Sequence, residues 1–231
     1  MCNRYTIRNP CEIRLAHLGA PFGDFAPRYN VAPTDIVPVF AVDSETGLKT
    51  TKMRWGFVPS YDNRDKPQVV PLNAKSETVL TKPMFRDAVQ HRRCVMPADG
   101  FYEWHHLNER TKVPHFFHFA DDRVFFFASI YSEGTEKHPP TCALLTTDPL
   151  ETVKPFHGRS PLMLNEAQAL EWMRPGLISV NQLSSLVEGS RWGSDLAQHV
   201  VTARVGSTKN RLDGPKCIEP IQPEVDLFGQ R

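Results

Sequence analysis

The sequence predicts an α+β fold: a single domain, residues 1–231, of strand-rich antiparallel sheets with a barrel-like form and a few short flanking helices. Strand-like and helix-like segments do not alternate as they do in βαβ units, which argues against a doubly wound parallel sheet. Twenty prolines against thirteen glycines favour many short elements joined by turns. A chain of 231 residues can bury about 70% of its unfolded surface in one core, so it needs no disulfide or metal to fold.

The elements are expected in the following order. A short helix begins at the N-cap Asn9, with Pro10 at its first position, and ends at Gly19. Apolar runs on either side of the turn-rich segment 43–47 predict a β-hairpin. Asn165 opens the clearest helix with a start typical of a capping box. Strands are expected at 36–42, 48–57, 94–96, 101–104, 114–119, 123–131, 141–146 and 199–205, and further helices at 85–93 and 180–187. The tail after about residue 222 is expected to be partly disordered.

Composition and charge exclude several classes of protein. Hydrophobic residues make up 40% of the chain and charged residues 23%, with a mean hydropathy of -0.38, values unlike those of a disordered or collagen-like chain. No run approaches the ~20 apolar residues of a membrane span. Lys and Arg total 27 against 26 Asp and Glu, so any site for a polyanion must be a local groove. The N-terminus lacks a basic region followed by an apolar one, and we expect a cytoplasmic protein. No feature demands more than a monomer.

Neither disulfides nor a metal site is expected. The five cysteines are dispersed and include no Cys-x-x-Cys pair, which argues for free thiols and against a zinc ribbon. His115 and His118 lie three residues apart on a predicted strand and therefore face opposite ways, so they cannot chelate one ion.

Cys2 is the most informative residue for function. Removal of the initiator Met leaves an N-terminal cysteine whose α-amine and thiol together form a 1,2-aminothiol. The α-amine titrates near ~7.7–8.0, so part of it is a neutral nucleophile at cytosolic pH. Such a group condenses with an aldehyde to a Schiff base, which the thiol closes to a thiazolidine ring. The alternative is that Cys2 is a small residue tolerated after Met1.

Two further side chains are candidates for proton transfer. Glu103 follows a predicted turn at 98–100, and strand alternation places it on the same face as Phe101, so burial would raise its pKa. The alternative is an exposed strand carboxylate near a turn. His157 lies in a loop-like stretch, where acid–base histidines are often found, and Arg159 two residues later could hold a phosphate. The alternative is a surface His–Arg pair without a catalytic role.

The segments 28–33 and 73–77 are polar turns beside strands, rich in groups that bind phosphate or a base edge. With Trp55, Tyr61 and Trp104 as stacking surfaces, they could form a groove for single-stranded nucleic acid. The alternative is that Trp55 and Trp104 are core aromatics, the usual position of Trp on a strand.

Six blocks of sequence carry a specific pattern. They are MCNRY at 1–5, RYNVAPT at 28–34, RWGFVPS at 54–60, NAKSET at 73–78, RCVMPADGFYEW at 93–104 and HGRSP at 157–161. Together with VGSTKN at 205–210 they resemble the SOS response-associated peptidase (SRAP) family of abasic-site processing proteins, from end to end of the chain. Three positions depart from the family's usual residues: Asn3 in place of Gly, Lys75 in place of Arg, and Ser160 in place of Met or Arg. Lys75 keeps the charge of Arg but loses its bidentate phosphate geometry.

The resemblance implies a single α+β domain whose mature N-terminal cysteine crosslinks to the ring-opened aldehyde of an abasic site in single-stranded DNA. The product is a stable thiazolidine, with Cys2 as the nucleophile and Asn73 orienting it and the opened sugar. Glu103 would shuttle protons during ring closure, and His157 would assist sugar opening and Schiff-base turnover. The positions that would contact DNA are Arg4, Lys75, Trp104 and Arg159. The resemblance implies no cofactor, metal or membrane.

Two other functions use the same residues. In the first, Cys2, His157 and Glu103 act as nucleophile, base and orienting acid of a cysteine peptidase, which could be limited to releasing Met1 from its own chain. In the second, the chain binds single-stranded nucleic acid without catalysis. We expect an enzyme of DNA damage and the SOS response, with crosslinking and lyase-like activity and a cysteine-type autopeptidase activity.

Overall fold

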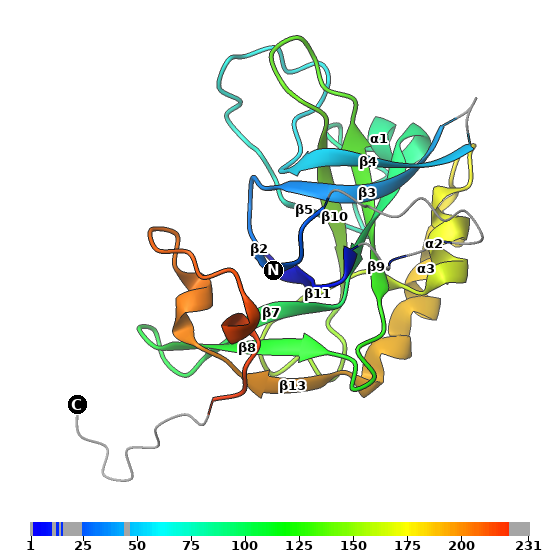
Figure 1. Ribbon diagram of the computed structural model, residues 1–231. Helices are drawn as coiled ribbons and strands as arrows, with labels where there is room; N and C mark the ends of the chain where they lie inside the picture. Colours follow the sequence, from blue (N-terminus) through cyan, green and yellow to red (C-terminus); the bar gives the residue numbers. More distant parts are fainter. Residues whose placement is uncertain (1, 11–12, 14, 16–24, 44–46, 222–231) are drawn as a thin grey trace.

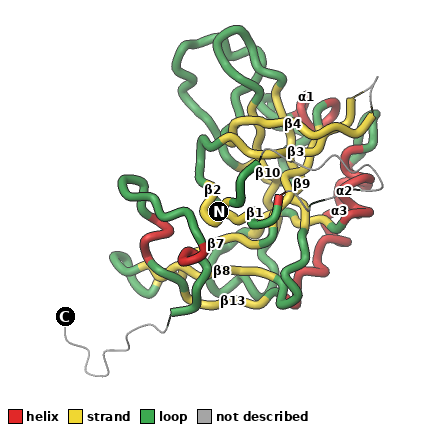
Figure 2. The backbone as a smooth tube through the Cα atoms, viewed as in Figure 1, coloured by secondary structure: helices red, strands yellow, loops and turns green. Residues whose placement is uncertain are grey.

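The strands of the protein form two sheets that meet around β1, near the centre of the molecule (Figures 1 and 2). The computed structural model describes residues 2–10, 13, 15, 25–43 and 47–221. Within these residues there are three α-helices, all short, and the connections between strands are mostly loops (Figure 2). The predicted fold class is confirmed. No described helix combines the length and the apolar character needed to cross a bilayer.

The first sheet is antiparallel throughout. Its order is β13 (Ala197–Val200), β8 (Lys112–His118), β7 (Gly100–His106), β1 (Tyr5–Ile7) and β2 (Arg28–Val31).

The second sheet is mixed and turns back on itself. Its order is β11 (Ser160–Pro161), β10 (Thr141–Thr147), β4 (Gly47–Trp55), β3 (Ile36–Asp43), β6 (Arg93–Ala98), β9 (Phe125–Ser132) and β12 (Met163–Leu164), with β5 (Asn73–Lys75) beside β10. An additional pairing of β9 with β10 gives the sheet its barrel-like form. Most strand pairs are antiparallel, as expected; β10 departs from this pattern and runs parallel to both β4 and β5.

Local sequence signals account for several elements. The predicted hairpin is β3 and β4, paired from Ile36 with Arg54 to Asp43 with Gly47. The helices are α1 (Arg86–His91), α2 (Glu166–Met173) and α3 (Val180–Gly189). The capping box predicted for α2 is present: the side chain of Asn165 accepts from the backbone N–H of Gln168 at 2.9 Å, and the Gln168 side chain accepts from the Asn165 N–H.

The predicted strand at 199–205 is wrong after Val200. The chain turns instead into a 3₁₀ helix, Ala203–Gly206, because the side chain of Thr202 accepts from the backbone N–H of Arg204 and caps its start. The helix predicted from Asn9 to Gly19 falls mostly on residues 11–12, 14 and 16–19, which lie outside the described residues. The tail predicted to be disordered likewise falls on residues 222–231, outside the described part.

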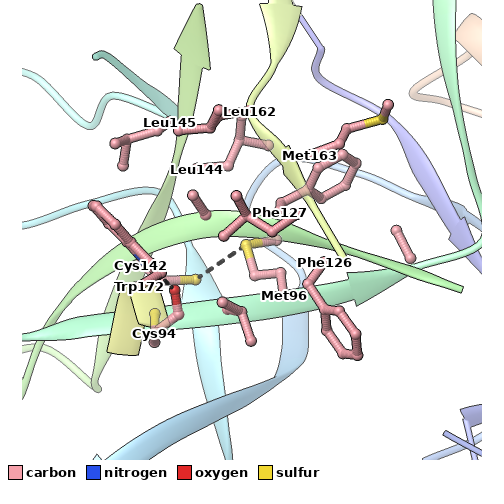
Figure 3. Packing of buried hydrophobic residues seen from close by; sticks show 14 of the residues in the cluster. Cys94, Met96, Phe126, Phe127, Cys142, Leu144, Leu145, Leu162, Met163 and Trp172 are labelled. Carbon is pink, nitrogen blue, oxygen red and sulfur yellow. Dashed lines mark hydrogen bonds between the residues drawn. The ribbon is translucent and has the colours of Figure 1, made fainter. Parts of the chain in front are cut away.

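The main core is formed by buried side chains of both sheets and of the helices, and Trp172 of α2 is completely buried in it. Its indole N–H donates to the backbone carbonyls of Cys94 and Ser129 at 2.9 and 3.1 Å, which ties α2 to β6 and β9. Beside it, the thiol of Cys142 lies 3.9 Å from the sulfur of Met96 (Figure 3). The free-thiol prediction is confirmed for the four described cysteines, all of them buried: Cys2, Cys94, Cys142 and Cys217.

Strand β1 is fixed at the corner between β6 and β7 by the buried carboxylate of Asp99. The hydroxyl of Thr6 donates to one carboxylate oxygen at 2.5 Å, and the backbone N–H of Arg8 donates to the other at 2.6 Å. The next residue is Gly100 because a Cβ there would lie 2.3 Å from the ring of Phe116. These contacts fix β1 beside β7 in the first sheet, and with it the position of the residues just before β1.

Candidate active site

A cleft of about 730 Å³ opens beside the first sheet. It is formed by the residues before β1, the end of β7, the turn after β2 and the segment that follows β13. From the residues predicted as functional, it brings together Arg4, Glu103, Trp104 and His157. Among the described residues, its lining does not include the other predicted residues Asn73, Lys75 and Arg159.

Cys2 lies directly before this lining and is only 1% exposed. Its thiol lies 3.6 Å from the backbone carbonyl of Arg4, to which it donates. Burial raises the pKa of the Cys2 thiol, and the nearby charge of Glu103 raises it further. The side chain is therefore a neutral thiol at neutral pH, packed at one end of the main core.

Glu103 is buried, with 2% of its surface exposed, so the alternative of an exposed strand carboxylate is wrong. Alternation along β7 explains this position: Phe101 belongs to the main core, whereas Tyr102 and Trp104 pack in a second cluster with Phe116 and Val205. Burial raises the pKa of Glu103 to about 7. A carboxyl group with this pKa can both give and take a proton near neutral pH.

His157 lines the cleft from the loop between β10 and β11. Its Nδ1 accepts a hydrogen bond from the backbone N–H of Arg159 at 3.0 Å. Burial lowers the pKa of the imidazole, which favours the neutral ring. The Arg159 carbonyl oxygen also lies 3.3 Å from Nδ1. The shorter contact, in which Nδ1 accepts, favours the neutral ring with its proton on Nε2.

Asn73 begins β5, where it pairs with Leu144 of β10. Its side-chain oxygen is buried and has no hydrogen-bond partner among the described residues. A buried amide oxygen without a partner costs ~1–3 kcal/mol, so it is well suited to accept a hydrogen bond from a ligand.

Arg4 is a buried cation on the wall of the cleft, 6% exposed. It donates to the side-chain oxygen of Asn30 at 3.0 Å, and within the described part of the chain no carboxylate forms an ion pair with it. Burial and the neighbouring charge of Arg211 both lower the pKa of Arg4. Arg211, in contrast, is held by the carboxylate of Asp35, to which it donates at 2.8 Å. The wall thus presents a buried guanidinium that no carboxylate of the described residues contacts directly.

Lys75 and Arg159 lie together near β5 and β11, outside the cleft. Lys75 is exposed. The Arg159 guanidinium forms a bidentate ion pair with Glu77 at 2.7 and 2.8 Å. A phosphate could bind Arg159 only by sharing or displacing this carboxylate, and its DNA contact stays a prediction.

The three aromatic residues considered as stacking surfaces differ in exposure: one is buried in the core, one lines the cleft and one is exposed. Trp55 is fully buried and donates to the backbone carbonyl of Leu72, so it is a core residue and not a stacking surface. Trp104 is half-buried and lines the cleft, beside Gly206. Tyr61 is 68% exposed.

Comparison with known proteins assigns the chain to a family. Residues 1–208 match the family described as SOS response associated peptidase (SRAP). The chain belongs to the SRAP family. An abasic site processing protein of Bacillus subtilis, YoqW, is 31% identical over 95% of this chain and 99% of the relative. YedK of Escherichia coli, also named an abasic site processing protein, is 30% identical over 96% of this chain and 100% of the relative.

Solved structures share the fold at lower identity. A protein from Bacteroides thetaiotaomicron superposes with a TM-score of 0.74 at 19% identity, over 96% of this chain and 100% of that one. A phage-related protein from Bordetella bronchiseptica gives 0.72 at 24% identity, over 92% of this chain and 100% of that one.

Two of the three departures from the usual SRAP residues have clear positions. Asn3 is exposed and lines the cleft. Ser160 is fully buried, and its hydroxyl accepts from the backbone N–H of Leu150 at 2.9 Å, so it supports the loop of His157 from inside the fold.

The sequence analysis missed several residues of the SRAP cleft: Asp35, His106, Lys112, Thr208 and Arg211. A usable signal exists for two of them, because His106 follows Glu103 and Trp104 on one strand and the hairpin pairs it with Lys112. Arg211 and Asp35 lie 176 residues apart, and no local pattern connects them.

Proposed function

We propose that this SRAP-family chain processes abasic sites in single-stranded DNA by forming a covalent thiazolidine crosslink between Cys2 and the ring-opened sugar. One observation carries the proposal: the buried carboxyl group of Glu103, with a pKa of about 7, interacts with the thiol of Cys2 beside an open cleft. The relatives named abasic site processing proteins support the choice of substrate.

The reaction needs the free α-amine of Cys2, after removal of Met1. The nitrogen attacks the aldehyde carbon of the opened sugar, and the carbonyl oxygen takes up a proton to give a carbinolamine. Loss of one water molecule gives the Schiff base. The sulfur then adds to the same carbon while the thiol proton passes to the nitrogen, which closes the five-membered ring. The net change is one water released, with no oxidation or reduction.

Glu103 serves these proton transfers. Protonated, it can donate to the departing oxygen of the carbinolamine; ionised, it can take the proton of the thiol and return it to the nitrogen. Its pKa of about 7 makes both forms available at neutral pH. His157, neutral and protonated on Nε2, supplies a hydrogen-bond donor for the sugar oxygen that is released on ring opening. Asn73 supplies the acceptor that orients the opened sugar, for which its side-chain oxygen, unpaired among the described residues, is suited.

The DNA backbone is assigned to the basic side of the cleft. Arg4 is a buried guanidinium that no described carboxylate contacts, and a phosphate would supply that contact. Lys112 is exposed at the rim. Trp104 offers a half-buried ring against which a base could stack. An intracellular DNA substrate agrees with the cytoplasmic location expected from the sequence, and the protein would act as a monomer.

Autopeptidase activity is a second candidate that the same groups favour. The Cys2 thiol, Glu103 and His157 could cleave the bond after Met1, which would expose the amine that crosslinking requires. This activity would prepare the enzyme for the DNA reaction and would need no other substrate.

One assay separates these functions. The protein, shown by intact mass to lack Met1, is incubated with single-stranded DNA carrying one abasic site, and the products are heated in denaturant and resolved by electrophoresis. A heat-stable adduct of the mass of protein plus DNA minus water supports the crosslinker. Salt-sensitive binding without an adduct would leave only a nucleic-acid binder, and cleavage of unrelated peptides would indicate a general peptidase.

A chain that keeps extra residues before Cys2 is the matched control. Its Cys2 nitrogen is an amide, which is not nucleophilic because of peptide resonance. It should bind the same DNA and form no adduct. Efficient crosslinking by this chain would exclude the aminothiol reaction.

A further inference from the structure

The side chain of Arg159 links the His157 loop to the second sheet. We call its contacts with Glu77, Thr146 and Asp148 the Arg159 clasp. Its guanidinium forms the bidentate ion pair with Glu77 and also donates to the backbone carbonyl of Thr146 at 2.8 Å. The carboxylate of Asp148 lies 3.3 Å away. The Arg159 side chain is 16% exposed, whereas Glu77 and Asp148 are 45% and 71% exposed. The bidentate geometry with Glu77 and the added bond to the Thr146 carbonyl, rather than exclusion of water, hold the guanidinium in one orientation.

The partners of Arg159 lie on a rigid edge. Lys75 of β5 pairs with Thr146 of β10, and the next backbone N–H, that of Ser76, donates to the Thr146 carbonyl at 2.9 Å. Glu77 follows directly and is therefore fixed relative to β10. The contacts with Glu77 and Thr146 therefore fix the Arg159 guanidinium relative to β10.

The same residue, Arg159, holds the imidazole of His157 through its backbone. Its N–H donates to Nδ1 at 3.0 Å across Gly158, a residue with open space around its Cα. The loop is anchored on both sides of Gly158: the backbone N–H of His157 donates to the Val153 carbonyl at 3.0 Å, and Ser160 pairs with Thr147 of β10. Between these anchors, the side-chain contacts of Arg159 help to fix where its backbone N–H points. That hydrogen bond favours the neutral ring with its proton on Nε2, over the alternative in which Nδ1–H donates to the Arg159 carbonyl oxygen at 3.3 Å.

We propose that Glu77 is a positioning residue for His157, acting through Arg159. The role rests on the proposed crosslinking function, because it concerns how His157 presents its Nε2–H to the opened sugar. Glu77 does not touch the substrate in this role; its carboxylate keeps the His157 imidazole in the productive tautomer and orientation.

The charge of Glu77 should affect DNA binding and the rate of the chemical step in opposite directions. Glu77 is a carboxylate beside Lys75 and Arg159, two side chains predicted to contact DNA, and it cancels part of their charge. Replacing it by Gln should therefore leave binding of single-stranded DNA at least as tight while slowing the chemistry. A residue that only bound DNA or only stabilised the fold would not change these two quantities in opposite directions.

The first test measures His157 directly, without DNA. Imidazole ¹⁵N spectra of the full chain, with His157 assigned from a His157→Gln sample, report which ring nitrogen carries the proton. The wild type should show the Nε2–H tautomer, and Glu77→Gln should show a mixture of both tautomers. The matched control is Glu151→Gln, which removes an exposed carboxylate paired with Lys154 on the neighbouring turn and should keep the wild-type spectrum.

The second test measures adduct formation with abasic single-stranded DNA. Glu77→Gln should lower the rate constant at saturating DNA about tenfold, less than the ~10²–10⁴-fold loss of a removed acid–base group, with unchanged or tighter binding. Glu77→Asp, which keeps the charge, should recover part of the rate. Unchanged His157 tautomer and unchanged rate in Glu77→Gln would overturn the proposal. Absence of any adduct with the wild type would instead overturn the crosslinking function, while the spectra would still decide whether Glu77 orients His157.

Discussion

Replacing Glu103 by Gln should make the protein more stable above neutral pH, although it removes a group of the proposed reaction. Glu103 is 2% exposed, and burial raises its pKa from an ordinary 4.5 to about 7. A carboxyl group with a raised pKa favours the folded state while it is protonated. Its contribution is fully present below pH 4.5 and is lost as the pH rises through about 7.

The magnitude follows from the difference between the two pKa values. One pKa unit corresponds to about 1.4 kcal/mol, so the rise from 4.5 to about 7 corresponds to about 3 kcal/mol of unfolding free energy. For a chain of this size, ~3 kcal/mol shifts Tm by about 6–12 °C. Gln has nearly the same shape as the protonated acid and does not titrate, so Glu103→Gln does not lose this stability at high pH.

The measurement is a set of melting curves of wild type and Glu103→Gln between pH 4.5 and 8.5. The Tm of the variant minus that of the wild type should increase across this range and level off above pH 8. Groups that do not interact with residue 103 titrate alike in both proteins, and their contributions cancel in the difference. Glu109→Gln, at an exposed position in the turn between β7 and β8, should show no such trend. A constant difference between wild type and Glu103→Gln would refute the raised pKa and the proton-shuttle role that depends on it.

Three further outcomes follow from the site and the core. Cys2→Ala should form no heat-stable adduct but should keep a Schiff base that borohydride reduction traps, because its amine remains; heat-stable adducts at the wild-type rate would rule out the thiol. Arg4→Gln should reduce the salt dependence of single-strand binding by about 0.7 in the logarithmic slope, one phosphate contact, whereas Lys52→Gln, exposed on β4, should leave it unchanged. Arg93→Leu should lower Tm by about 6–12 °C through the loss of ~3 kcal/mol, since its guanidinium donates to the carbonyls of Val89, Gln90 and Trp172 at the ends of α1 and α2; an unchanged Tm would contradict this account.

The elements that could be predicted from the sequence are those with local signals. The β3–β4 hairpin and the capping box of α2 depend on residues within a few positions of one another. Strand alternation with Phe101 indicated a buried Glu103 as one of two alternatives, and the structure shows that it is buried. In each case the residues that determine the feature are separated by only a few positions in the sequence.

The features that were missed depend on contacts between distant segments. The parallel pairing of β10 with β4 joins Thr141 to Arg54, and no periodicity of either strand encodes its direction. The ion pair of Arg211 with Asp35 likewise joins two loops. The position of Arg159 shows a different limit: its charge was evident in the sequence, but its neutralisation by Glu77, 82 residues away, was not.

Burial of the Cys2 thiol determines the order in which the two bonds of the proposed ring form. Its pKa is raised by burial and by Glu103, so the sulfur is a neutral thiol and a weak nucleophile at neutral pH. An unperturbed α-amine titrates near ~7.7–8.0, below the ordinary pKa of a thiol, so the amine of a processed chain is the better candidate for the first attack. In the proposed reaction the carbon–nitrogen bond would therefore form first, and the sulfur would add only after the Schiff base has made the carbon more electrophilic. By then the proton of the thiol must leave, and the carboxylate that opposed the thiolate is the group placed to accept that proton. If the proposed reaction holds, the charge interaction by which Glu103 raises the pKa of Cys2 would both suppress premature reaction of the thiol and assist ring closure.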